Sequence, residues 1–189
     1  MHTGKNLSGK PIYSITNGQK VGVVKDIYLS DDLSEVIGLH LGTEGIIKRK
    51  TLAIVRDNVA VLGIDAILTK NANVVIDDKD MSEIKGWLRL GKLQGREVDT
   101  PGGTKVGTIG DVIVDEDGMI TGYLLGRVLV EGPIAEQRSI SREVMIDPGD
   151  GDDAMTIDLS KAEGGATPET AEVVAQAVEA VDDRSFPLT

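Results

Sequence analysis

The sequence predicts an all-β protein made of two tandem small antiparallel β-barrels, with a short linker helix and a C-terminal helix. One pattern of about 70 residues occurs twice, which is typical of a duplicated unit. Leu7-Ser8-Gly9-Lys10 aligns with Leu93-Gln94-Gly95-Arg96 at an offset of 86 residues. Of the 189 residues, 40% are apolar but only 3% are aromatic, so the cores must consist of Val, Ile and Leu, which favour strands.

The correspondence continues along both halves and drifts by only a few residues, as expected for small loop insertions in a shared fold. Matched segments are Gly18–Gly22 with Gly103–Gly107, Asp26 with Asp111, Gly38–Gly42 with Gly122–Gly126, and Ala66 with Ala154 at an offset of 88. We therefore divide the chain into a first barrel (1–79), a linker helix (80–91), a second barrel (92–160) and a joint with a C-terminal helix (161–189).

The first unit shows how each barrel is expected to begin. Gly9–Tyr13 reads as a strand, and Asn17-Gly18 as a tight hairpin turn in which both central residues have positive φ. Val21–Leu29 follows as one return strand, and its imperfect alternation indicates a bulge. Further strands are expected at Val36–Leu41, Thr51–Val55, Val59–Leu62, Ala66–Leu68, Ser139–Ile146 and Ala154–Ile157.

The linker carries the signals of a short helix. Asp80-Met81-Ser82-Glu83 has the spacing of a capping box, and Ile84, Trp87 and Leu88 then fall on one face. Gly91 is expected to end the helix. Because a large ring near a domain junction is usually buried, we expect Trp87 to pack in the groove between the units rather than to contact a ligand.

A second helix is predicted near the C-terminus. Ala162–Ala166 reads as a flexible joint, and Thr167-Pro168-Glu169 is typical of a helix start. The helix should run to about Val181 and carry a narrow apolar stripe. It either folds back on its own barrel or docks on a partner protein, which makes Val174, Val178 and Phe186 candidate partner contacts.

The repeated motifs resemble those of a known family. Leu-x-Gly-Lys/Arg, then Gly-x-Lys-Val-Gly, then Asp-Ile/Val, and later Gly63-Ile64-Asp65-Ala66, are similar to the PRC-barrel domain over residues 6–77 and 91–159. The second half reads Gly151-Asp152-Asp153-Ala154 at the last motif. The resemblance implies a small antiparallel β-barrel in each half.

The resemblance also implies a role in protein docking. PRC barrels form the cytoplasmic part of the photosynthetic reaction centre H subunit and the C-terminal half of the ribosome maturation factor RimM. The chain is more similar to stand-alone proteins made only of PRC barrels, because it lacks the H subunit's spanning helix and RimM's different N-terminal domain.

No pattern in the chain predicts an active site or a cofactor. Asp26 and Asp111 are matched carboxylates without a nearby histidine or nucleophile, so we expect them to accept backbone N–H groups. The acidic run at Asp147, Asp150, Asp152 and Asp153 lacks the ligand spacing of an EF-hand and reads as a solvated hairpin.

Two further possibilities are weak. His2 and His40 are too far apart in sequence to suggest a metal site, and the chain has no cysteine to supply a thiolate ligand or nucleophile. Residues 100–105 are glycine-rich but lead into a strand rather than a helix, so they indicate a turn and not a phosphate-binding loop. The sequence thus predicts neither an enzyme nor a bound metal or cofactor.

Charge is distributed unevenly. Residues 1–90 hold 12 Lys and Arg against 11 Asp and Glu, whereas residues 91–189 hold 8 against 20, which gives a net charge of −11. Such an acidic chain disfavours nucleic-acid binding. Lys48-Arg49-Lys50 is the only run of three basic residues, and it reads either as a protected strand edge or as a docking patch for an acidic partner, including the acidic half of another copy.

These features favour a cytoplasmic, non-catalytic adaptor or scaffold that binds a protein partner or forms a homo-oligomer. It could equally be a peripheral subunit of a photosynthetic or other membrane-associated complex, since the sequence shows no transmembrane segment. The candidate contacts are Lys48, Arg49, Lys50, Val174, Val178 and Phe186. The alternative, by analogy with RimM, is an RNA- or ribosome-associated assembly factor that uses the basic run.

Overall fold

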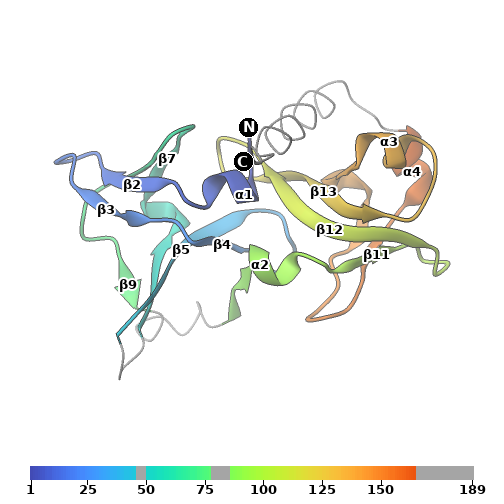
Figure 1. The fold of residues 1–189 in the computed structure, drawn as a ribbon, viewed down its shortest axis with the longest axis horizontal. Helices are drawn as coiled ribbons and strands as arrows, with labels where there is room; N and C mark the ends of the chain where they lie inside the picture. Colours follow the sequence, from blue (N-terminus) through green and yellow to red (C-terminus); the bar gives the residue numbers. More distant parts are fainter. Residues whose placement is uncertain (46–49, 78–85, 165–189) are drawn as a thin grey trace, which may run out of the picture.

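The computed structural model describes residues 1–45, 50–77 and 86–164 as two β-rich lobes that lie side by side (Figure 1). The first half of the chain forms one lobe and the second half the other, with two short helices at the centre. The first-half elements are β1 (His2–Thr3), α1 (Gly4–Leu7), β2 (Pro11–Ser14), β3 (Lys20–Val23), β4 (Asp26–Leu29), β5 (Val36–Glu44), β6 (Lys50–Val55), η1 (Arg56–Asn58), β7 (Val59–Leu62), β8 (Ile67–Thr69) and β9 (Ile76–Asp77). Those of the second half are β10 (Leu88–Arg89), α2 (Leu90–Leu93), β11 (Glu97–Asp99), β12 (Lys105–Val114), β13 (Ile120–Val128), α3 (Pro133–Gln137), β14 (Ser139–Ser141), η3 (Arg142–Val144), β15 (Met145–Asp147), β16 (Met155–Ile157) and α4 (Leu159–Gly164).

The same strand order occurs in both halves. One first-half sheet runs β3-β2-β8-β7 and another runs β10-β4-β5-β6-β9, whereas the second half forms one sheet, β14-β13-β12-β11-β16-β15, to which β1 adds. Ile12 pairs in parallel with Ile67, and Val98 pairs in the same way with Met155. These pairs reproduce the offsets of 86 and 88 that the sequence predicted, so the internal repeat is a structural one.

The all-β class is confirmed, whereas the two tandem small antiparallel barrels are not, because the described strands form several sheets and no closed barrel. β2 and β8 run parallel, as do β11 and β16. Each sheet has open ends in its hydrogen-bonded order, and no ladder joins the two first-half sheets. The first half therefore consists of two sheets and the second half of one, packed over a shared core rather than closed into cylinders by hydrogen bonds.

Most predicted strands are present, with two changes in the first unit. Val21–Leu29 is not one strand, because it divides into β3 and β4, which belong to different sheets. In the predicted tight turn only Gly18 has positive φ, and the Ser14 carbonyl accepts the Gly18 N–H at 2.9 Å, so the loop is longer than a two-residue hairpin. The predicted strand Ser139–Ile146 likewise divides into β14 and β15 around η3.

The linker differs most from its prediction. Residues 80–85 lie outside the described part, but Leu88 belongs to a strand and Gly91 lies inside α2 instead of ending a helix. Trp87 is indeed packed, with its ring centroid 5.5 Å from that of Tyr28. It covers the outer face of the β4–β5–β6 sheet beside Ala53, rather than a groove between the halves.

At the C-terminal end, α4 occupies residues that the sequence assigned to a flexible joint. Leu159 and Ala162 pack against the main core, which explains why the helix forms there. The predicted helix from Thr167 to Val181 lies outside the described residues, as do Val174, Val178 and Phe186.

Candidate interaction surfaces

The two halves exchange their leading strands. β1 precedes the first half but pairs with β12 of the second, with His2 opposite Val114. β10 precedes the second half but pairs with β4 of the first, with Leu88 opposite Leu29. Since His2 and Leu88 are matched positions at the offset of 86, the two contacts are equivalent and the halves are related by an approximate two-fold symmetry (Figure 1).

Two matched carboxylates anchor the exchanged segments. Asp111 on β12 accepts the backbone N–H of Lys5 in α1 at 3.1 Å, and Asp26 on β4 accepts that of Gly91 in α2 at 3.3 Å. Each carboxylate also accepts the N–H of the residue that follows it. The predicted backbone-binding role is confirmed, and it lies across the boundary between the halves, which sequence reasoning did not foresee.

The surroundings of these two carboxylates differ. Asp111 is 3% exposed, and this burial raises its pKa above the ordinary value although three backbone and side-chain donors oppose the shift. Asp26 is only half-buried. The first arm, which comprises β1 and α1, is therefore held by a deeply buried carboxylate, whereas the second arm, β10 and α2, is held by a more accessible one.

The exchanged helices meet at the centre of the molecule. Gly4 and Leu90 occupy matched positions, and a Cβ atom built on Gly4 would lie 2.5 Å from Leu90 Cδ2. A glycine facing a leucine lets the two helices approach where two leucines would collide. Leu7 and Leu93, the last residues of the two helices, are fully buried in the common core.

Two arginines at matched positions form hydrogen bonds between the halves. Arg142 in η3 donates to the Leu33 carbonyl at 3.3 Å and forms an ion pair with Asp32 at 3.3 Å. Its counterpart Arg56 in η1 donates to the Asp117 carbonyl at 2.8 Å. Each arginine thus binds the turn between the two central strands of the opposite half, a second reciprocal contact.

A short ladder and a buried tyrosine join these turns directly. The Val36 N–H donates to the Gly118 carbonyl, and the Ile120 N–H donates to the Ser34 carbonyl, each at 2.8 Å. Tyr123 is fully buried and its hydroxyl donates to the Leu33 carbonyl at 3.0 Å, while burial raises its pKa. The halves therefore form one continuous body.

The repeated Leu-x-Gly-Lys/Arg motif has a local purpose in both units. Lys10 donates to the Gly63 carbonyl at 2.7 Å, and Arg96 donates to the carbonyls of Pro148, Gly149 and Gly151 at 2.7 to 3.1 Å. In each half the cation holds the loop between the last two core strands. The acidic run therefore belongs to a hairpin whose carbonyls bind a guanidinium, in agreement with the hairpin prediction.

The first-half loop presents an apolar residue to solvent. Lys10 binds the Gly63 carbonyl and the His2 ring binds the Leu62 carbonyl, so the base of the loop is fixed on two sides. Ile64, at its tip, is 82% exposed, more than any other large apolar residue in the described part of the chain. The loop thus combines a fixed base with an exposed apolar tip.

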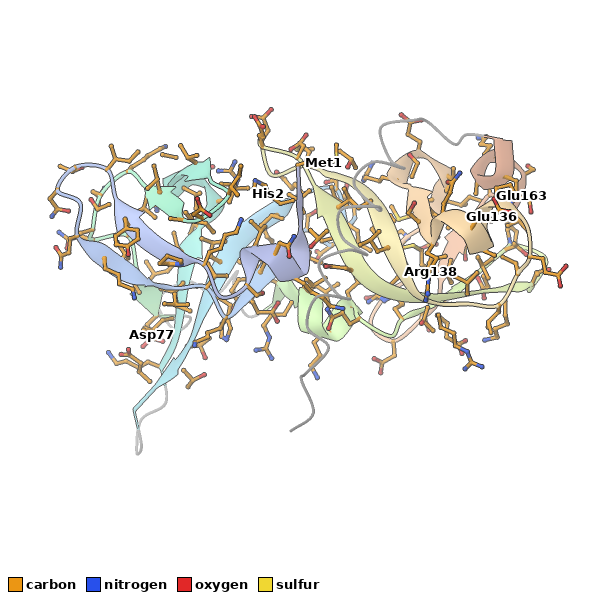
Figure 2. All side chains as sticks on the ribbon, turned by 45° about the horizontal axis from the view of Figure 1, so that its top comes forward. Met1, His2, Asp77, Glu136, Arg138 and Glu163 are labelled. Atoms are coloured by element: carbon orange, nitrogen blue, oxygen red, sulfur yellow. The ribbon has the colours of Figure 1, made fainter. Side chains whose placement is uncertain are left out.

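The basic run lies elsewhere. Lys48 and Arg49 are outside the described residues, while Lys50 begins β6 and its ammonium lies 3.9 Å from the carboxylate of Asp77. The second half differs at this place: β5 and β6 pair as far as Glu44 and Lys50, whereas β13 and β14 pair only over short segments and α3 precedes β14. Asp77 and Glu136 lie at opposite ends of the molecule (Figure 2).

Within residues 1–45, 50–77 and 86–164, no group of three His, Asp or Glu side chains is arranged to hold a metal ion. His2 and His40 lie apart, and the His40 ring contacts the Tyr28 hydroxyl at 3.0 Å. No helix in this part of the chain has the length and hydrophobicity needed to cross a membrane.

Comparison with known proteins gives one assignment. The family model of the PRC-barrel domain matches residues 1–80, which span β1 to β9. A search of curated proteins finds no match. Residues 1–80 of this chain are therefore similar to the PRC-barrel domain.

Proposed function

We propose that this protein is a non-catalytic adaptor in which two PRC-type units form one rigid body that docks on another protein. The second unit repeats the strand order and the Leu-x-Gly-Lys/Arg contact of the first, which supports its inclusion in the same family. As an adaptor, the protein would serve as a peripheral subunit of a larger complex in the cytoplasm, including a membrane-associated one.

The use of the polar side chains supports this proposal. Five acidic and basic side chains that could act in catalysis in another protein bind backbone groups here and so stabilise the fold: Asp26, Asp111, Arg56, Arg96 and Arg142. An enzyme would need at least a pair of such groups directed at a common point in a cavity. The described residues thus favour a surface-based function.

The single observation that carries the proposal is the Ile64 loop. Its tip exposes a branched aliphatic side chain, and its base is fixed by Lys10 and His2. Binding to a preformed loop costs less conformational entropy than binding to a mobile one, so such a loop suits protein docking. We assign Ile64 as the centre of the docking surface.

The experiment is affinity capture from a lysate of the source organism with the full-length protein, repeated with Ile64→Asp. We expect a stoichiometric partner that the wild type retains and that Ile64→Asp binds at least about tenfold more weakly, as for a central contact residue. Ile15→Asp is the matched control, because Ile15 is also exposed, at 56%, but lies in a different loop.

Three outcomes would contradict the proposal. Recovery of no partner would remove the adaptor role, and equal loss of binding in both variants would remove Ile64 as the contact. Salt-sensitive retention of RNA or ribosomal particles, unaffected by Ile64→Asp, would favour the RNA-associated alternative through the basic run.

A further inference from the structure

The first arm contains a buried histidine whose protonation state is fixed by its neighbours. His2 is 8% exposed and its Nε2 lies 2.8 Å from the Leu62 carbonyl, which can only accept a hydrogen bond. Nε2 must therefore carry the proton. Nδ1 lies 3.4 Å from the Lys10 ammonium, which can only donate, so Nδ1 must be the unprotonated acceptor.

A second proton on this ring conflicts with that arrangement. It would bind at Nδ1 and place an N–H group against the Lys10 ammonium, so that two cations would face each other at 3.4 Å. Lys10 cannot easily turn away, because it also holds the Gly63 carbonyl at 2.7 Å. Relief comes most readily if the short strand β1, which spans only His2 and Thr3, leaves β12.

Five influences act on the charge of the His2 ring. Lys10 and the amino group of Met1 oppose protonation, as does burial, while Glu116 in the β12–β13 turn and the hydrogen bond to Leu62 favour it. Burial is the largest of these effects, and the pKa of His2 lies below its ordinary value. Figure 2 shows His2 on the arm between the two lobes, next to Met1.

The second arm is a natural control within the same molecule. Leu88 occupies the position of His2 and pairs with Leu29 as His2 pairs with Val114. A leucine cannot take up a proton, so contact between β10 and β4 has no equivalent sensitivity at this position. His40, the histidine nearest to the second arm, contacts the Tyr28 side chain rather than a residue of β10, so only the first arm carries an imidazole on its own paired strand.

We propose that mild acid releases β1 from β12 through protonation of His2, while β10 stays on β4. Release leaves α1 in place, since Leu7 is fully buried and Asp111 still binds the Lys5 N–H. It uncovers the edge of β12 at Ile113 and Val114 and frees the base of the Ile64 loop on one side. The contact of the first arm with the second half thus depends on the protonation state of His2.

The sign of the effect follows from linkage. Because the docked state lowers the pKa of His2, docking is strongest above the ordinary histidine pKa of about 6.5 and weakens as the pH falls through that value. Each unit of difference between the released and docked pKa lowers the docking equilibrium about tenfold. Asp111, whose pKa is raised, acts in the opposite sense, so its titration does not explain loss of docking in acid.

The test is amide hydrogen exchange of the full-length protein between about pH 7.5 and 5, corrected for the intrinsic exchange rate at each pH, with the His2 ring followed by NMR. We expect the amide protection of β1, and of Ile113 and Val114, to fall severalfold in acid. The pH midpoint of this loss should coincide with the midpoint of the His2 titration. Protection at β10, and the fluorescence of Trp87 beside it, should stay constant.

His2→Leu copies the second arm and is the matched variant. It should keep β1 protected across the whole pH range, because its side chain cannot be charged. Equal protection of wild-type β1 at both pH values would overturn the proposal, as would loss of protection in His2→Leu that matches the wild type. Parallel loss at β10 would also overturn it, since that would indicate general unfolding.

Discussion

The two halves share a strand order but differ in whether the strand after the first turn is continuous or divided between two sheets. In the second half β12 runs unbroken for ten residues beside β13, whereas in the first half the matched segment divides into β3 and β4. The cause lies in the next strand. Thr43 and Glu44 of β5 pair with β6, while Arg127 and Val128 at the matched positions of β13 pair with β12.

The strand with which the end of β5 or β13 pairs therefore decides the sheet architecture of each half. Because β5 continues into a hairpin with β6, its end is directed away from β3, and the first half opens into two sheets. In the second half, α3 replaces the hairpin, so β13 can stay on β12. The contacts between the halves occupy matched positions on both sides but differ in burial and in the residues that make them.

The largest effect is expected where the two arms enter the core. Leu7→Ala and Leu93→Ala each truncate a fully buried leucine at a matched position, and each should lower the free energy of unfolding by about 2–5 kcal/mol. Both variants should unfold in a single transition in urea, because the core is shared. Separate transitions for the two halves would break the comparison.

The glycines of the central strands should respond differently. A Cβ on Gly107 would lie 2.1 Å from the backbone carbonyl oxygen of Arg127, whereas one on Gly22 would lie 3.0 Å from the flexible Leu41 side chain. Gly107→Ala should therefore cost about 1–3 kcal/mol of stability in thermal or urea unfolding. Gly22→Ala should change stability by no more than about 0.5 kcal/mol, and equal costs would contradict the different use of β12 and β3.

The anchoring carboxylates give a similar contrast. Asp111→Ala removes both acceptor oxygens from a buried site and should cost about 1–3 kcal/mol, whereas Asp26→Ala, at a half-buried site, should cost about 1 kcal/mol or less. Amide exchange should show the loss at Lys5 in one variant and at Gly91 in the other. Loss at neither position would contradict the assignment of these groups as anchors.

The outer arginines are expected to contribute less than the buried positions Leu7, Leu93, Gly107 and Asp111. Arg142→Met and Arg56→Met each remove hydrogen bonds to the opposite half, and each should cost about 1 kcal/mol, as measured by urea unfolding. Raised salt should reduce the cost for Arg142, which also pairs with Asp32. A salt effect of the same size for Arg56 would contradict the difference, because Arg56 binds a carbonyl.

Much of the fold could be read from the sequence, since strands over β5, β6, β7 and β8 follow directly from apolar runs between turn residues. The repeat offset was also visible, and it led to the matched carboxylates Asp26 and Asp111. What the sequence could not show is which half each short segment joins. Leu88 and Arg89 look helical by spacing, but tertiary pairing with β4 decides their conformation.

The same limit applies to the candidate contacts. The basic run was predicted as a contact because a cluster of charged residues can be recognised in the sequence. Ile64 was not predicted, because the solvent exposure of a single side chain can be known only from the structure. The one signal that could have identified Ile64 is its position inside a motif whose neighbours, Gly63 and Asp65, are turn formers. An apolar residue at such a place is directed outward unless another segment covers it.

The most direct test of the account is to cut the chain between its halves and ask whether they remain together. A protease site placed within residues 78–85 of the full-length protein allows cleavage after folding, and native mass spectrometry then measures the products. The exchanged arms predict a one-to-one complex of the two halves that persists at about 1 µM, as for a stable protein–protein interface. Separation into two independently folded fragments at that concentration would contradict the claim that each half is completed by the other.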